Sequence, residues 1–271
     1  MFLHTTRTEW LKIKYYPVFW LLLGLTMLSY PGINYLFFTI YKTQAAKQDT
    51  AGMLVNMLVG NPFTFPEVFR TVAYASSLFI FIPAILIIML VTNEYTYKTH
   101  RQNIIDGWSR QQFMLGKFID VTIITLIITA TYLLVTLGIG YFNLEASGTG
   151  NKWSLVYYTG LFGLQVFSQL SFAFMIGLVL RRSFLALSVF IFYAFILEQI
   201  LAGLARWKLE GAGRFLLLEV SDMLTPVPAF LGRLDEAAYT RSLSLVQPHV
   251  WLTLLYTLCF WAITLLVYRK R

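Results

Sequence analysis

Six stretches of this chain are each long and apolar enough to cross a bilayer as a helix. They cover residues 18–40, 72–92, 119–142, 155–180, 184–204 and 250–268. About 20 predominantly apolar residues in a helix span the hydrocarbon core of a membrane. Within that core each backbone N–H and C=O needs a partner, which a helix supplies from its own backbone. The sequence therefore predicts an all-α integral membrane protein with six transmembrane helices, forming a single domain over residues 1–271.

The composition supports a membrane protein and argues against a nucleic-acid-binding protein. Hydrophobic residues make up 58% of the chain and charged residues 13%, although the formal net charge is +8. Soluble domains carry about 25% charged residues. Much of the positive charge stands at the ends of apolar stretches, which is typical of membrane proteins. The first apolar stretch is longer than the roughly 7–15 apolar residues of a signal peptide, so we expect it to be retained as a span.

The distribution of basic residues predicts the orientation in the membrane. The connecting segments alternate between two sides, and one side holds 12 of the 21 Lys and Arg residues, in the segments 1–17, 93–118, 181–183 and 269–271. The other side holds the remaining 9 in longer segments. Short segments rich in Lys and Arg stay in the cytoplasm. We therefore expect a multi-pass protein of the plasma (inner) membrane with both termini in the cytoplasm.

Two further elements are expected outside the spans. The stretch RTEWLKIKYYPVFW mixes aromatic, aliphatic and basic residues before the chain turns at Pro17. It favours a short helix in the membrane interface, with an unstructured basic tail as the alternative. The outer segment 205–249 contains the mainly apolar GRFLLLEVSDMLTPVPAFLG, which is too interrupted to span. We expect partly inserted or interfacial helices there, before the sixth span.

The polar segment 93–118, between the second and third spans, has the signals of an ordered structure. We expect the second span to continue as a helix to Ile105 and to stop at Gly107, which can adopt a positive φ. Ser109 is followed three residues later by Gln112, which fits a capping box. A new helix is therefore expected to begin there and to run into the third span. The segment as a whole is predicted to be a helical hairpin on the cytoplasmic side.

Trp108 stands at the tip of this predicted hairpin, with Ile104 and Ile105 one turn earlier. An apolar anchor ringed by polar residues is typical of a docking surface. The alternative is that Trp108 belongs to the belt of aromatic residues at the membrane interface. The residues alone leave both interpretations open.

The order of residue types in this segment resembles the ABC-2 type permease family, the membrane halves of ATP-binding-cassette exporters. The matching positions are Glu94, Tyr95, Thr99, Arg101, Gly107, Ser109, Arg110, Phe113 and Lys117. The six spans, the N-terminal interfacial helix, the very short connection between the fourth and fifth spans and the long outer segment also resemble the family. The chain departs from the family at Lys98, where Gly is frequent, and near Gly107, where Pro is frequent. These departures leave the geometry of the turn open.

The resemblance implies a permease subunit that exports a lipid, a peptide or a hydrophobic small molecule and is driven by two copies of a separate ATPase subunit. It implies a coupling helix in the polar segment, which favours docking for Trp108. The expected ATPase contacts are Arg101, Ile104, Ile105, Gly107, Trp108, Ser109 and Arg110. Six spans make half of such a pathway, so we also expect a second permease protomer, forming a homodimer or a heterodimer.

The chain carries no sequence motif for catalysis of its own. No Gly-x-x-x-x-Gly-Lys-Ser/Thr loop and no His-Glu-x-x-His motif occurs. We therefore expect no enzyme activity and no cofactor in this chain, with ATP and Mg²⁺ bound by the partner ATPase. The single cysteine, Cys259, excludes a disulfide within the chain and a multi-cysteine metal site.

Polar residues within the spans are candidates for a transport pathway. Glu198, in the fifth span, either pairs with a helix end or an outer basic residue, or lines a pathway. Gln165 and Gln169 share one face of the fourth span and indicate either helix–helix contact or a substrate path. Asp120 is expected to lie in the membrane interface near Lys117.

Two other classes of function stay open at this stage. The chain could be a non-transporting membrane anchor or an assembly factor of a larger complex. It could also be an ion-coupled secondary transporter, a class expected to contain more buried charge and internal repeats.

Within the second span, Pro83 removes one backbone hydrogen bond, so a kink is expected there.

Overall fold

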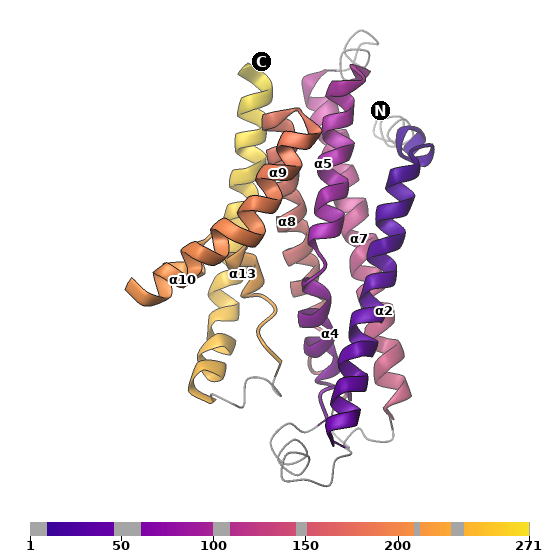
Figure 1. Ribbon diagram of the computed structural model, residues 1–271, viewed down its shortest axis with the longest axis vertical. Helices are drawn as coiled ribbons and strands as arrows, with labels where there is room; N and C mark the ends of the chain where they lie inside the picture. The colour runs from indigo at the N-terminus through magenta and orange to yellow at the C-terminus, as the bar shows by residue number, and fades with distance from the viewer. Residues whose placement is uncertain are drawn as a thin grey trace.

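The described part of the chain is all-helical, as predicted. The computed structural model describes residues 10–45, 61–99, 109–144, 151–208, 212–228 and 236–270. Within these ranges five helices are long and apolar enough to cross a membrane, or six if one bent pair counts as a single span. The helices form an elongated bundle, and α2 (Pro17–Ala45) begins at the end of the bundle where α13 (Glu236–Lys270) finishes (Figure 1).

The central helix of the bundle is α8 (Tyr158–Leu180). It packs against α5 (Phe81–Thr96), α7 (Arg110–Phe142) and α13. In an apolar 18-residue stretch of α8, 61% of the residues are buried inside the protein, compared with 17% in the span Ser183–Ala205. Helices in lipid associate through close packing, because lipid tails are as apolar as leucine. Gly177 provides such packing, since a Cβ there would lie 3.5 Å from the Ile88 backbone of α5.

The second span is broken into α4 (Val68–Ser77) and α5, which meet at an angle of 49°. The break at residues 78–80 lies just before Pro83. Pro83 has no N–H to donate to the Phe79 carbonyl one turn earlier, which instead accepts a bond from the Ile82 N–H at 3.1 Å. The bend expected from Pro83 is therefore present.

The fifth span consists of three consecutive segments. They are α9 (Ser183–Phe192), the π-helical turn η3 (Tyr193–Leu197) and α10 (Glu198–Lys208). A π-turn inserts one extra residue into a helix, and such insertions are frequent at functional positions. Beyond this turn α10 leaves the bundle and projects sideways (Figure 1).

The outer segment differs from its predicted boundaries. It contains the short helical turns η4 (Ala212–Phe215) and α11 (Glu219–Asp222), and α11 packs against α8 and α13. The last helix begins at Glu236 and not near residue 250. Residues 236–247 contain no Gly or Pro, so the backbone can continue as a helix before the apolar stretch begins.

The chain before the first span is helical over residues 10–14 and turns just before α2 begins at Pro17. Ile13 is buried against the bundle, while Trp10 and Tyr15 are exposed. The Trp20 Nε1–H donates to the Lys14 carbonyl at 3.0 Å, so this short helix is held against the first turn of α2.

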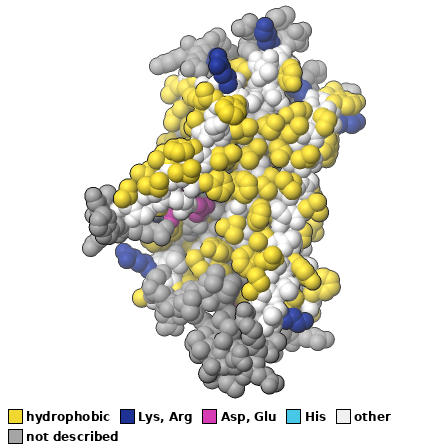
Figure 2. Space-filling model, in the orientation of Figure 1, with side chains coloured by type: hydrophobic (Ala, Val, Ile, Leu, Met, Phe, Trp, Pro, Cys, Tyr) yellow, Lys and Arg dark blue, Asp and Glu magenta, His cyan; other side chains and the backbone are white. Residues whose placement is uncertain are grey.

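Hydrophobic side chains form a broad band over the face shown in Figure 2. Exposed Lys and Arg side chains gather above this band, at the end where α2 begins, and a few lie below it. A lipid-facing surface requires such a band, and the basic residues at its edge can stay in contact with water.

Candidate functional site

The predicted capping box at the start of α7 is present. The Ser109 hydroxyl accepts from the Gln112 N–H at 3.2 Å, and the Gln112 side-chain oxygen accepts from the Ser109 N–H at 2.6 Å. Both bonds satisfy N–H groups that would otherwise lack partners at a helix N-terminus. The helix then continues without interruption through Lys117 into the third span, as expected.

The predicted end of the second span is wrong. Its helix finishes at Thr96, and Lys98 adopts a left-handed conformation with φ 58°. Glu94 is the last buried residue before this end, and Tyr97 is already 73% exposed. Without packing against the bundle, helix propensity alone stabilises few further turns. The helix of the second span is interrupted at Tyr97 and Lys98, and so it does not run continuously to Ile105.

The predicted docking tip lies largely outside the described residues. Arg101, Ile104, Ile105, Gly107 and Trp108 all fall in residues 100–108, and Arg110 is described only by its backbone. Of the seven expected ATPase contacts, only Ser109 can therefore be placed with its side chain. The proposed contact of this segment with an ATPase stays a prediction.

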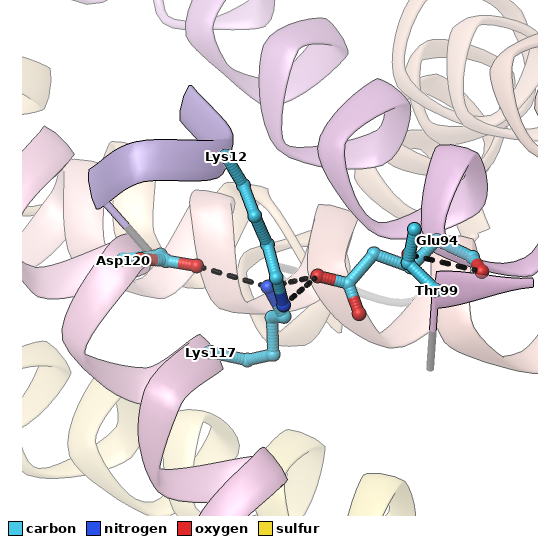
Figure 3. A network of polar contacts seen from close by, with 5 residues as sticks. All are labelled: Lys12, Glu94, Thr99, Lys117 and Asp120. Atoms are coloured by element: carbon cyan, nitrogen blue, oxygen red, sulfur yellow. Dashed lines mark hydrogen bonds and ion pairs between the residues drawn. The ribbon is translucent and has the colours of Figure 1, made fainter. Parts of the chain in front are cut away.

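A network of charges connects α5, α7 and the short N-terminal helix (Figure 3). The Lys117 ammonium of α7 contacts Glu94 Oε1 of α5 at 2.5 Å and Asp120 Oδ2 at 3.1 Å. Lys12, from the short N-terminal helix, contacts the same Glu94 oxygen at 3.4 Å. Two cations and two carboxylates are thus brought together from three separate segments. We call these four residues the charge network.

Burial makes the charge network structurally demanding. Lys117, Glu94 and Asp120 are 4%, 6% and 6% exposed. Transfer of an isolated charge out of water costs several kcal/mol, so each charge in such a place depends on its partners. Asp120 contacts Lys117 as expected, and its side chain is buried within the protein. The sequence did not predict Lys12 as a partner, because the only signal around Lys12 is the amphipathic character of its segment.

The charge network is also connected to the last helix. Lys117 Nζ lies 5.6 Å from the centre of the Phe113 ring, and that ring stacks on Tyr268 of α13 at 5.1 Å. A cavity of about 270 Å³ adjoins the network, with Tyr16, Leu90 and Asn93 among its walls. The starting end of α7 is therefore in contact with the N-terminal helix, the end of α5 and the end of α13.

Glu198 lies far from the charge network and binds the outer segment. Its Oε1 accepts from the N–H groups of Leu218 and Glu219, each at 2.7 Å. Glu198 is 2% exposed. This geometry matches pairing with a helix end, one of the two interpretations that the sequence left open.

Gln165 and Gln169 of α8 bind the same outer segment. Both amides donate to Asp222 Oδ1, at 2.9 and 2.7 Å, and Gln169 also donates to the Ser221 hydroxyl at 3.1 Å. The Thr225 hydroxyl donates to Gln165 Oε1 at 2.9 Å. The polar face of the fourth span thus contacts the outer segment. Sequence reasoning did not identify Asp222 as the partner, since 57 residues separate it from Gln165.

Within the described ranges, no group of three or more His, Cys, Asp or Glu side chains is placed to hold a metal ion. The charge network contains only two carboxylates, and each contacts a lysine. Its arrangement is suited to holding helices together and not to coordinating a metal.

Comparison with protein-family models matches residues 5–197 to the family described as ABC-2 family transporter protein. The match covers well over half of the 271 residues and runs from the N-terminal segment to the π-helical turn of the fifth span. It includes all four residues of the charge network. Comparison with curated proteins gave no match.

Proposed function

Because the chain belongs to the ABC-2 transporter family, we propose that it forms one half of an export pathway driven by two copies of a separate ATPase subunit. The chain is the membrane component of such a transporter and not its ATPase. The second half of the pathway is a further permease protomer, either identical or related. The bent pair α4–α5 counts as one span, which makes six spans in a single domain with both termini in the cytoplasm.

The observation that supports this proposal is the way in which the charge network joins three segments at one end of the bundle. Lys117 and Glu94 tie the start of α7 to the end of α5, and Lys12 ties both to the N-terminal helix. The polar segment between α5 and α7 is therefore anchored at both of its ends. A force applied to this segment would move the two spans and the N-terminal helix together, as in a hinge or shear transition.

The segment 93–118 contains the proposed coupling helix, and Trp108 and Arg110 are its proposed central ATPase contacts. The capping box at Ser109 supports this role, because it gives α7 a defined starting point within the proposed contact region. Helix ends commonly fray, and the two bonds of the capping box hold the first turn of α7 in place.

The proposed substrate is a lipid, a peptide or a hydrophobic small molecule, and it would pass between the two protomers. The contacts of Glu198, Gln165 and Gln169 favour a role in holding the outer segment against α8 and α10 over a role in lining the pathway. The short N-terminal helix exposes Trp10 and Leu11, which supports its proposed position in the membrane interface.

Co-purification tests the proposal. The tagged chain is co-expressed with the ATPase encoded beside it, extracted in mild detergent, and assayed for bound ATPase and for ATP-dependent transport. We expect the ATPase to be captured, and we expect the Trp108→Ala/Arg110→Ala variant to lose both capture and transport. The matched control is Trp251→Ala/Arg269→Ala in α13, which lies outside the polar segment.

Two results would count against the proposal. Failure to capture any ATPase would favour the membrane anchor or assembly factor. Transport that is driven by an ion gradient and persists without ATP would favour the secondary transporter.

A further inference from the structure

A second cavity, of about 620 Å³, lies between the end of α5 and the turn that joins α8 to α9. We call it the basic cavity. It is separate from the charge network, and the sequence suggested only that the turn is short and basic. The residues that line it are Tyr95, Thr96, Lys98, Arg181, Arg182, Ser183 and Phe184.

Among the described residues, the charge that lines the basic cavity is entirely positive. Its lining contains three cations and no carboxylate, and within the described ranges none of Lys98, Arg181 and Arg182 forms an ion pair. The C-terminal ends of α5 and α8 stabilise these cations in part, but a helix end supplies only about half an elementary charge. Three cations around one space therefore leave an excess of positive charge.

The backbone around the basic cavity is also unusual. Lys98 and Arg181 are the two non-glycine residues with positive φ in the described part of the chain, both at 58°, and both line this cavity. Such a conformation costs a non-glycine residue conformational free energy, and such residues cluster at functional sites. Glycine would adopt the same conformation without this cost. Lys98 and Arg181 thus place two cations at positions that glycine would occupy without this cost.

Two further features favour a phosphate ligand. The start of α9 has no side-chain cap, and its first two residues, Ser183 and Phe184, line the basic cavity, so N–H groups that lack partners within the helix lie beside the cavity and can bind an anion. The Arg181 guanidinium lies 5.0 Å from the centre of the Tyr95 ring, which holds it in place beside the basic cavity. A guanidinium held in a fixed position is well suited to phosphate oxygens.

The surroundings favour a phosphate that belongs to a lipid. Phe184 is 85% exposed at the start of α9, a helix whose side chains face mostly outward from the bundle. A ligand bound at the basic cavity therefore has an apolar, lipid-facing surface directly beside it. Basic pockets between transmembrane helices on the cytoplasmic side are known to bind anionic lipid headgroups.

We propose that the basic cavity binds the phosphate of an anionic phospholipid from the leaflet on the side of the termini, with an acyl chain lying along Phe184 and α9. The lipid would bridge the end of the second span and the turn between the fourth and fifth spans. This inference does not depend on the proposed transport function.

Native mass spectrometry tests the proposal. The full chain is placed in nanodiscs of phosphatidylcholine and phosphatidylglycerol in equal amounts, released in mild detergent, and the retained lipids are counted by headgroup. We expect retained phosphatidylglycerol to exceed phosphatidylcholine. The Arg181→Gln/Arg182→Gln variant should lower this preference about tenfold to thirtyfold, since one cation near an anionic lipid contributes about fivefold.

The control removes the same charge from the same end of the bundle, in Lys14→Gln/Arg269→Gln, and should keep the preference. Arg181→Gly is a second test variant, because glycine accepts a φ of 58° and the fold is retained while the cation is lost. It should lower the preference about fivefold.

Three outcomes would overturn the proposal. One is an equal retention of both lipids by the wild-type chain. Another is an equal loss of preference in the control, which would show that total charge and not the cavity selects the lipid. The third is binding of inorganic phosphate in pure phosphatidylcholine nanodiscs without any preference for phosphatidylglycerol, which would assign the cavity to a free anion.

Discussion

Lys117 is the residue on which the packing at the proposed coupling end depends most. Its ammonium lies between Glu94 and Asp120, and all three side chains are buried. The net worth of a buried ion pair is small compared with the cost of leaving one partner alone. Changing Lys117 alone and neutralising the whole network should therefore have very different effects.

Lys117→Met should lower the free energy of unfolding by about 3–5 kcal/mol, because two buried carboxylates lose the cation that both contact. The triple variant Glu94→Gln/Lys117→Met/Asp120→Asn should recover most of this loss, since no buried charge remains without a partner. Thermal unfolding in detergent measures both, with the exposed Lys14→Met as the control. Equal destabilisation in the single and triple variants would contradict the charge argument.

Substitutions at Glu198 test whether this residue holds the outer segment in place or lines a transport pathway. Glu198→Gln keeps the side-chain oxygen that accepts from Leu218 and Glu219, so stability should change by less than about 1 kcal/mol. Glu198→Ala leaves both N–H groups without this acceptor and should cost about 1–3 kcal/mol for each. A Glu198→Gln protein of normal stability that has lost transport would show instead that the charge itself is required.

At the scale of elements, the ends of α5 and α7 show which helix boundaries a local sequence pattern determines and which depend on packing. The start of α7 is determined locally, by Ser109 and Gln112 three residues later. The end of α5 is determined by loss of packing after Glu94, which no short sequence pattern encodes. The first of these was predictable from the sequence, and the second was not.

Ser109→Ala should remove the cap and cost about 0.5–2 kcal/mol at the start of α7. Ser109→Asp should preserve it, because a carboxylate accepts the same N–H bond and is favourable at a helix N-terminus. Hydrogen exchange of the amides of residues 110–114 measures the loss of the cap. The exchange should be faster in Ser109→Ala and unchanged in Ser109→Asp. Ser244→Ala, in an exposed part of α13 that caps no helix, is the control. Unchanged exchange in Ser109→Ala would mean that contacts of the charge network alone hold this turn.

At the scale of the whole molecule, the bundle surrounds α8 and is open on the side of α9 and α10. In the apolar stretch of the fifth span, only 17% of the residues are buried inside the protein. The outer segment reaches from α10 back to α8 through Glu198 and Asp222. This segment therefore provides much of the polar contact that connects α10 to the rest of the protein.

The orientation of the bundle can be tested by cysteine labelling. In a Cys259→Ala background, Ser109→Cys should react with a membrane-impermeant thiol reagent only after the membrane is opened, because this residue is predicted to face the cytoplasm. Asn151→Cys, in the connection predicted to lie outside, should react in intact cells. Labelling of Ser109→Cys from outside would reverse the predicted topology.

The sequence by itself determined the features that depend on local composition. The lengths of the apolar stretches placed the membrane-spanning helices, because the bilayer sets the length that a helix needs. Pro83 predicted the bend between α4 and α5, and Ser109 with Gln112 predicted the start of α7, since both act over one helical turn. The resemblance of the polar segment to the ABC-2 family identified the family itself, which the family match confirmed.

Only the tertiary structure decided which polar residues meet. Lys12 and Glu94 are 82 residues apart, and Gln165 and Asp222 are 57 apart. A buried polar group needs a partner, but its own sequence position does not say from which helix the partner comes. That choice depends on how the helices pack around α8, and the same packing decided where α5 ends and where, among the described residues, three cations without an ion pair surround one cavity.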